Sequence, residues 1–508
     1  MAVSPAAHCF LDLSSNLESL IVTQLNRRGG MALLNFRRVA PPAPERRIVL
    51  ESPMPARLLS ILTALALLAP ATGHANDLLR LYQEALVQDQ TLHAARYARD
   101  ASVEARPQAW AAVLPQLSAS GGIQRQEIKT ASGSRIINNQ VVQGGNFSTS
   151  RTWAVNFDDT IFSFAAFLDI AQSNVQVAAA ENTFLGNQQD LVMRVAQAYF
   201  TVLSARDTVR ADTAARDAFK AEMDEAEARF KVGLSTITAV QQAKSSFDSA
   251  NATLIGDQQA LDNARQALGV IVGRDVSEVQ PLRPEIPLVP PAPSMPDDWV
   301  ARALDDNFDV RSARLQRDIA QREVGIQRAQ RLPTIDLQGA IGRSSVDNLP
   351  DSARRSYAIG LAVNLPLFQG GMIRSRVRQA SATAAQDEAQ FQLAQRTTKQ
   401  QVLDAYRGVL SGIASVTAFK QAVASSNTAL ESTRVGFRVG TQTEIDVLTA
   451  QQNLYSALKS YFLSRYDYLT AGLTLKQRTG HLTVADLERV DALLDPEAGE
   501  QQQESVLP

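Results

Sequence analysis

Two long stretches of the chain carry the hydrophobic spacing of helices. No proline occurs over residues 116–280 or 367–495, and a proline inside a helix costs about 3 kcal/mol. Apolar residues recur there every three or four positions, as in a helical seam. The spacing predicts long helices, one of them from about Gly371 to Val435, which is about 100 Å at about 1.5 Å per residue. The seam positions are Phe184, Leu191, Val195, Tyr199 and Val202 in the first stretch, and Val402, Tyr406, Val409, Ile413 and Val416 in the second.

Four shorter segments alternate between apolar residues and polar or small ones. The alternation is clearest at residues 152–158 and 357–365 and weaker at 117–123 and 335–341. A period of two indicates strands, and we expect roughly nine to eleven residues in each, the length of a tilted membrane strand. Polar loops are expected between paired strands, at Lys129–Asn146 and Ser344–Arg355.

The N-terminal region reads as targeting sequence. Residues 54–75 combine Arg57, an apolar stretch of Leu58–Ala69 and small residues before Asn76, which is typical of a secretory signal peptide. We expect residues 1–53 to be a disordered leader or the product of a mis-assigned start. The single cysteine, Cys9, lies in that leader, so disulfides and a thiol-linked lipid anchor are not expected in the mature chain.

The alternating segments have two interpretations. A half-buried hairpin of a soluble protein shows the same pattern, but an export signal together with paired hairpins favours membrane strands. A sheet in lipid must close into a barrel, and known barrels begin at about eight strands, so four strands require an oligomer. Aromatic residues gather at bilayer interfaces, which predicts a girdle that includes Trp153, Phe157 and Tyr357.

The two halves of the chain repeat each other. Leu114-Pro115 and Leu332-Pro333 precede the first strand of each half. Phe230–Gly233 corresponds to Phe437–Gly440, and this register continues without a gap to Gly273 and Gly480. A duplication explains these matches better than chance similarity between two alanine-rich helices.

Composition and charge exclude several functions. The net charge is -2, so no overall basic field exists to hold a nucleic acid. No histidine or cysteine cluster has the spacing of metal ligands, and no nucleotide or hydrolase motif is present, so we expect no metal, no cofactor and no enzyme activity. The acidic run from Glu222 to Glu227 is interpreted as a solvated helix face.

The motifs resemble those of the TolC family of outer-membrane exit ducts. The resemblance rests on Asn364–Ala380, on Ala228–Leu234, on Gly436–Leu448 and on Asp77–Leu86, and it covers residues 77–490. It implies a mainly α protein with a membrane β-barrel. Three subunits with four strands each would form a 12-stranded outer-membrane barrel that continues into a long periplasmic α-helical barrel.

The resemblance also implies a domain order. The first structural repeat would span residues 76–280 and the second 297–480, with a proline-rich equatorial belt at 281–296 between them. Residues 481–508 would supply an equatorial helix at 484–494 and a disordered tail. Seven of the prolines lie within the belt.

The implied function is a passive channel for efflux or type I secretion in the cell outer membrane, extending into the periplasm. Its partners would be two further copies, outer-membrane lipid, a periplasmic adaptor (membrane fusion) protein and an inner-membrane ABC or RND-type transporter. The alternative is an elongated coiled-coil envelope protein without a pore.

Site residues follow from the same resemblance. The turns Val232-Gly233-Leu234 and Val439-Gly440-Thr441 would dock the adaptor, and Asp446 would contribute a carboxylate ring to the pore entrance. The residues expected at the gate contacts are Phe437, Gln442 and Thr238. The second acidic position of the family is Thr449 here and an aspartate of the partner turn is Ala239, so we expect weaker contacts in this gate than in the family pattern.

Overall fold

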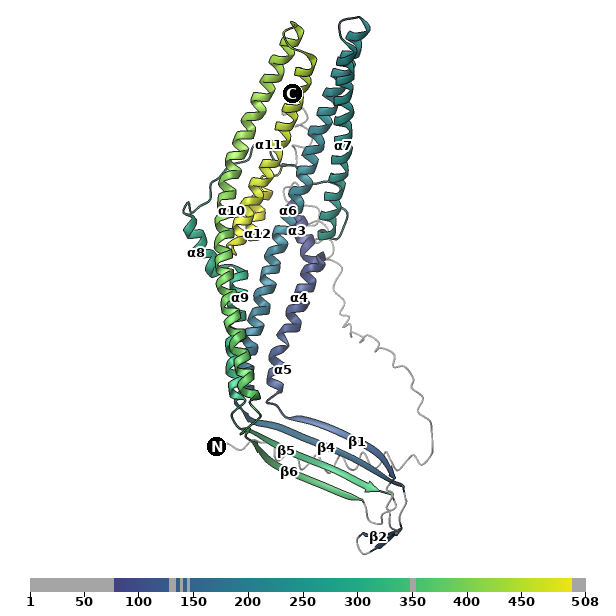
Figure 1. The fold of residues 1–508 in the computed structure, drawn as a ribbon, viewed down its shortest axis with the longest axis vertical. Coiled ribbons are helices and arrows are strands. Elements are labelled where there is room, and N and C mark those ends of the chain that lie inside the picture. The colour runs from purple at the N-terminus through teal and green to yellow at the C-terminus, as the bar shows by residue number, and fades with distance from the viewer. Residues whose placement is uncertain (1–76, 128–133, 138–139, 144–146, 348–352, 496–508) are drawn as a thin grey trace, which may run out of the picture. The chain divides into compact units, whose positions relative to one another are not determined.

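Helices make up most of the part of the chain that the structure describes. The computed structural model describes residues 77–127, 134–137, 140–143, 147–347 and 353–495. The expected leader, signal peptide and C-terminal tail lie outside these ranges. Within them, long helices continue from a four-stranded sheet (Figure 1), so the predicted mainly α fold with four strands is confirmed.

The four predicted strands form one antiparallel sheet. Strands β1 (Gln116–Glu127), β4 (Phe147–Ser163), β5 (Thr334–Val346) and β6 (Arg354–Asn364) lie in the order β1-β4-β5-β6. Each half of the chain supplies two of them, and the halves meet where β4 pairs with β5. Among the described strands, β1 and β6 are therefore edges, each paired on one side only.

The register gathers the apolar residues of the strands on one face. Tyr357 pairs with Ile341, and Ile341 pairs with Val155. Directly paired residues point to the same face, and residues two apart along a strand share a face. Trp153, Phe157 and Tyr357 therefore lie on one face of the sheet. The opposite face carries mostly small or polar residues, among them Ser118, Ser120, Thr152, Asn156, Gln338 and Ser356.

Two details of the strands correct the prediction. β1, β4 and β5 have 12, 17 and 13 residues, more than the roughly nine to eleven expected, because pairing continues beyond the alternating segments. The expected loop at 129–146 contains β2 (Ser134–Ile137) and β3 (Gln140–Gln143), which pair with each other. Pairs of β-branched residues, Ile136-Ile137 and Val141-Val142, favour this small hairpin.

The long helices form two helical hairpins of nearly equal size. Helix α6 (Phe164–Lys231) has 68 residues and α7 (Ile237–Val272) has 36. Their counterparts α10 (Met372–Arg438) and α11 (Glu444–Arg478) have 67 and 35 residues. Helix α10 contains the helix predicted from about residue 371 to 435, with Gly371 as its N-cap. These matching lengths confirm the internal repeat.

Shorter helices lead into the sheet and close the chain. Asn307 separates two of them: its side chain accepts hydrogen bonds from the backbone N–H groups of Asp309 and Val310 and donates one to the carbonyl of Arg478. The short helices are α3 (Asp77–Gln88), α4 (Gln90–Val103) and α5 (Ala105–Ala111) before β1, α8 (Pro296–Asp306) and α9 (Phe308–Ala329) before β5, and α12 (Val484–Asp491) after α11.

The main apolar core lies where the proline-rich segment and the C-terminal segment pack on the long helices. Leu282 pairs with Leu494, and the N–H of Arg283 donates to the carbonyl of Leu493 at 3.0 Å. Helix α12 consequently ends at Asp491 rather than at the expected residue 494, because the chain turns there to pair with the proline-rich segment. The buried seam residues of both stretches belong to this core: Leu191, Val195, Tyr199 and Val202, and Val402, Val409 and Val416.

A partly buried ion cluster ties the two helical hairpins together. The Nζ atom of Lys459 on α11 lies 3.0 Å from Oδ2 of Asp212 on α6 and 3.3 Å from Oδ2 of Asp257 on α7. Burial raises the pKa of Asp212 to about 6, and a hydrogen bond with Asp257 acts in the same direction. The ammonium group thus offsets part of the negative charge of two neighbouring carboxylates on the other hairpin.

We predict that Lys459→Met lowers the free energy of unfolding by about 3 kcal/mol at pH 7, because it leaves two neighbouring carboxylates without their cation. The loss should shrink below pH 6, where Asp212 becomes protonated. Unfolding followed by far-UV circular dichroism measures both effects.

Lys420→Met is the matched control, since Lys420 forms an exposed ion pair with Glu285 at 2.7 Å and surface pairs contribute little. Equal stabilities of the two variants would contradict a role for the Lys459 cluster in joining the hairpins.

Candidate functional site

The turns of the two helical hairpins share one backbone conformation. Gly233 and Gly440 have φ angles of 77° and 82°, in the region that favours glycine. In the first turn the N–H of Gly233 donates to the carbonyl of Phe230 and that of Leu234 to Arg229. The second turn repeats both bonds at the corresponding positions. This pair of bonds is the Schellman motif, which satisfies the last carbonyl groups of a helix.

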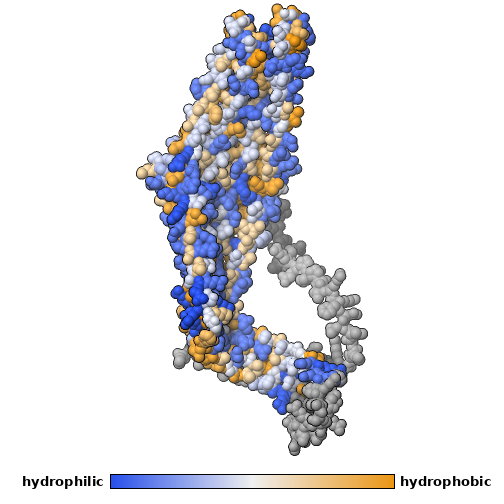
Figure 2. All heavy atoms as spheres, in the orientation of Figure 1, coloured by the Kyte–Doolittle hydropathy of each residue, from blue (hydrophilic) through white to orange (hydrophobic). Residues whose placement is uncertain are grey.

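Both turns expose aliphatic side chains. Val232 and Leu234 of the first turn are 69% and 78% exposed, and Val439 of the second is 69% exposed. Apolar residues accordingly gather at the ends of both hairpins (Figure 2). Neighbouring exposed aliphatic residues of this kind mark sites of protein contact more often than isolated ones do.

Asp446 lies one helical turn beyond the second hairpin turn and is fully exposed in the chain. Its Oδ2 accepts hydrogen bonds from the backbone N–H of Thr443 at 2.8 Å and from the hydroxyl at 2.7 Å, and the Thr443 hydroxyl caps the helix in return. The backbone and hydroxyl bonds from Thr443 hold the pKa of Asp446 below its usual value, so the residue carries a full negative charge at neutral pH. Thr449, one turn on, donates to the carbonyl of Ile445.

Phe437 packs against the other hairpin. The guanidinium carbon of Arg229 lies 4.7 Å from the centroid of the Phe437 ring, and Nη2 of Arg229 lies 2.6 Å from Oε1 of Glu225. A cation–π contact of this kind contributes about 0.5–1 kcal/mol at a partly exposed site. Gln442 and Thr238 are exposed, and no hydrogen bond or ring contact among the described residues joins either of them to Phe437.

Glu444 adds a buried acid to this contact. The residue is only 8% exposed, and its Oε1 atom has no hydrogen-bond partner among the described residues. Burial raises the pKa of Glu444, and the charge of Glu225 adds to the effect, while Arg229 and the Ser235 hydroxyl oppose it. Burial likewise raises the pKa of Glu222. Glu222 is half-buried while Asp224 and Glu225 are exposed, so the acidic run is only in part the solvated face that the sequence predicts.

The sequence contained only part of this cluster. The spacing of Glu225 and Arg229 is that of a helical ion pair, but the contact with Phe437 joins residues from different halves of the chain. Glu444 reads in sequence as an ordinary acid in a first helical turn, so nothing local indicates its burial.

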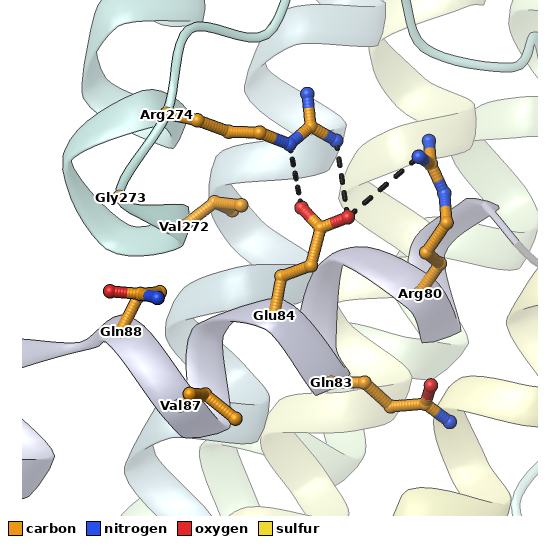
Figure 3. A pocket seen from close by; sticks show the side chains of 8 residues that line it. All are labelled: Arg80, Gln83, Glu84, Val87, Gln88, Val272, Gly273 and Arg274. Carbon is orange, nitrogen blue, oxygen red and sulfur yellow. Dashed lines mark hydrogen bonds and ion pairs between the residues drawn. The ribbon is translucent and has the colours of Figure 1, made fainter.

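A shallow hollow of 510 Å³ lies between α3 and the end of α7 (Figure 3). Its charged groups pair with one another: Glu84 accepts from Nε of Arg274 at 2.7 Å, and Arg80 lies 3.7 Å from the same carboxylate. A Cβ atom on Gly273 would lie 2.8 Å from Cβ of Gln88. The end of α7 thus packs closely on α3 at this hollow, and the charged groups there are already paired.

The described ranges hold neither a membrane-spanning helix nor a cluster of metal ligands. No helix in them is both long enough and apolar enough to cross a bilayer. No group of three or more His, Cys, Asp or Glu side chains there could hold a metal ion.

The sheet with one apolar face, continued by two long helical hairpins, is the fold of outer-membrane channels. The outer membrane protein VceC from Vibrio cholerae matches it with a TM-score of 0.66 at 24% identity, over 79% of this chain and 96% of that one. CusC, whose structures describe transmembrane channel formation, matches with a TM-score of 0.68 at 18% identity, over 80% and 92%.

Sequence comparison gives the family. The chain belongs to the outer membrane efflux protein family, whose profile matches residues 81–274 and 299–481. It is 29% identical to outer membrane protein TolC of Vibrio cholerae over 82% of this chain and 94% of that protein. It is 28% identical to the alkaline protease secretion protein AprF of Pseudomonas aeruginosa, over 84% and 89%. The expected resemblance and the outer-membrane location are thereby confirmed.

Glu444 and Asp446 should respond to pH in opposite directions. Glu444 has a raised pKa in the folded chain, so its contribution to stability is full below about pH 4.5 and is lost as pH rises through the raised value. Asp446 has a lowered pKa, so its contribution is present above about pH 4 and is lost as pH falls. We predict that Glu444→Gln raises the thermal midpoint at pH 7 and not at pH 4, whereas Asp446→Asn lowers it at pH 7.

Thermal unfolding of the detergent-solubilised protein across this pH range measures both variants. Each variant is the control for the other, because both remove one carboxylate from the same helical turn. A fall in the midpoint for Glu444→Gln at pH 7 would show that its buried carboxylate stabilises the turn.

Proposed function

We propose that three copies of this chain form a passive channel through the outer membrane, for efflux or type I secretion. The observation that carries the proposal is the four-stranded sheet, with one apolar face and two edges, β1 and β6. Backbone groups of an open edge in lipid cost several kcal/mol each. Pairing β6 of one subunit with β1 of the next removes these edges, and three subunits supply twelve strands, within the range of known barrels.

The membrane girdle belongs to the same proposal. Trp153 and Tyr357 are exposed, and they share the apolar face with the half-buried Phe157. Aromatic side chains favour the boundary between hydrocarbon and water. On this arrangement the apolar face meets lipid, while the face with small and polar residues lines the channel.

The hairpin turns serve as the docking surface for a periplasmic adaptor protein. Their exposed aliphatic residues support this role, and the matching Schellman turns would present two equivalent contacts in each subunit. The adaptor would couple the channel to an inner-membrane ABC or RND-type transporter, which supplies the energy. The docking surface comprises Val232, Gly233, Leu234, Val439, Gly440 and Thr441.

Asp446 forms the charged part of the channel entrance in this proposal. Its position one turn beyond Gly440 and its full exposure would allow three carboxylates to surround one axis. Phe437, Gln442 and Thr238 would provide the neighbouring gate contacts, with Phe437 also anchored on Arg229. An elongated envelope protein without a pore would need no sheet with an apolar face, so the channel is the better interpretation.

A ring of like charges in a narrow mouth attracts cations. We predict weak cation selectivity and block by polyvalent cations from the periplasmic side, both lost in Asp446→Ala. Single-channel recording in planar bilayers gives selectivity from the reversal potential and block from the current.

Asp262→Ala is the control, since it removes an equally negative exposed residue of α7, far from both turns. Unchanged selectivity and block in Asp446→Ala would leave Asp446 as a helix-capping residue only. A bilayer that stays closed with the unmodified protein would overturn the channel itself.

Valine at Gly233 and Gly440 should abolish export while the trimer still assembles. No atom lies within 4 Å of the added Cβ at either glycine, so the substitution acts through the positive φ, which a β-branched residue rarely adopts. Export from cells that depend on this channel measures the loss, and crosslinking of the trimer measures assembly.

Valine at Gly256 and Gly472 is the matched control, because these glycines also have open space but ordinary helical backbone. Normal export from a stably expressed Gly233→Val, Gly440→Val double variant would count against docking at the turns.

A further inference from the structure

Five exposed arginines gather where α9 ends and α10 begins. No aspartate or glutamate occurs in residues 324–335 or 365–386. Within the described structure, none of the five forms an ion pair. Glu323 lines the same hollow as Arg376 but forms no ion pair with it. A group of positive charges with so few acids beside it is suited to binding an external anion. The five, which we call the arginine patch, are Arg328, Arg331, Arg374, Arg376 and Arg378.

The two helix ends that carry the patch lie side by side. Thr334, the first residue of β5, pairs with Asn364, the last residue of β6. Closer to the helices, Nη1 of Arg376 donates to Oε1 of Gln330 at 3.3 Å. The patch therefore lies at one level of the molecule, directly next to the sheet.

Exposed apolar residues separate the patch from the strands. Leu367 and Phe368, between β6 and α10, are 88% and 87% exposed, and Leu332 before β5 is also exposed. Figure 2 shows an apolar region at this junction with strongly hydrophilic residues next to it on the helical side. The order from strand to helix is thus apolar sheet face, exposed apolar residues, then arginines. A bilayer presents the complementary order of hydrocarbon, interface and headgroup phosphate.

The first half of the chain lacks such a patch at its own junction. Arg106 is the one arginine of residues 104–115, and it has Glu104 beside it. The first twenty residues of α6, Phe164–Thr183, contain Asp169 and Glu181 and no arginine or lysine. Both halves of the chain form a strand-to-helix junction, but only the junction beside β5 and β6 carries the arginines. The positive charge is therefore not required to form such a junction.

We propose that the arginine patch binds the phosphate groups of anionic phospholipids in the periplasmic leaflet of the outer membrane. The planar guanidinium group donates two parallel hydrogen bonds to a phosphate, and basic residues beside a membrane are attracted to anionic lipid. The inference rests on the proposed barrel, which brings the sheet into the bilayer. Each subunit would hold anionic lipid beside β5 and β6.

The test compares two triple variants of α10 in the full-length protein. Arg374→Gln, Arg376→Gln, Arg378→Gln removes three charges from the patch. Arg396→Gln, Lys399→Gln, Arg407→Gln removes three exposed charges from the same helix farther from the sheet. Both are reconstituted in phosphatidylcholine nanodiscs with and without cardiolipin or phosphatidylglycerol, and bound lipid is counted by native mass spectrometry.

The patch variant should lose roughly tenfold or more in affinity for the anionic lipids, and the control variant should retain the affinity of the unmodified protein. The lipid-dependent rise in thermal midpoint should follow the same pattern and weaken with salt. Equal binding by the patch variant would overturn the inference.

Two other outcomes would also overturn it. A change in ion selectivity with lipid binding unaffected would place the arginines inside the channel, and loss of the trimer in every lipid would place them between subunits. Failure of the barrel proposal is distinguishable, because the unmodified protein would then not conduct in any lipid.

Discussion

The unpaired edges of the sheet are the constraint on which the rest of the structure depends. In hydrocarbon each backbone N–H and C=O must be bonded within the protein, and one chain satisfies this only between β1 and β6. In the proposed trimer, closing the edges with further copies would fix the position of every strand end. The strands β4 and β6 lead into α6 and α10, and α9, which leads into β5 between those strands, packs against both helices. Long helices with apolar flanks then continue the wall that the strands begin.

The duplication preserved backbone geometry more strictly than side-chain chemistry. Gly233 and Gly440 occupy matching places with matching hydrogen bonds, because few residues other than glycine adopt their φ angle. Chemistry differs at the same register: Asp446 corresponds to Ala239 and Lys459 to Ala252. The two hairpins therefore share one architecture but differ in the charged groups that each supplies, as in the cluster of Lys459 with Asp212 and Asp257.

Local pattern was sufficient for the strands and long helices, and insufficient for the contacts between them. Hydrophobic residues spaced two positions apart indicate the apolar face of a strand, and those spaced three to four apart indicate the apolar face of a helix. The strand around Tyr357 and the helix from about Gly371 were therefore predictable. Burial of Glu444 depends on Arg229 and Phe437, which come from the other hairpin or another helix. No local sequence pattern predicts a contact between residues of different helices. The β2–β3 hairpin was hidden for a different reason, because its flanking Ser, Asn and Gly residues are typical of loops.

The near-zero net charge conceals an uneven distribution of charge along the chain. Carboxylates and basic residues are mixed beside the hairpin turns, where Glu222, Glu225, Glu444 and Asp446 have Arg229, Lys231, Arg434 and Arg438 near them in sequence. The arginine patch, in contrast, lies at the opposite ends of the long helices in segments without Asp or Glu. Screening over about 8 Å at physiological salt prevents these regions from acting on each other across helices about 100 Å long. Each acts only on the molecules that touch it. The total charge therefore excludes an overall positive field that would hold a nucleic acid. It does not predict what binds at either end of the long helices, because recognition depends on the sign of the charge beside each surface.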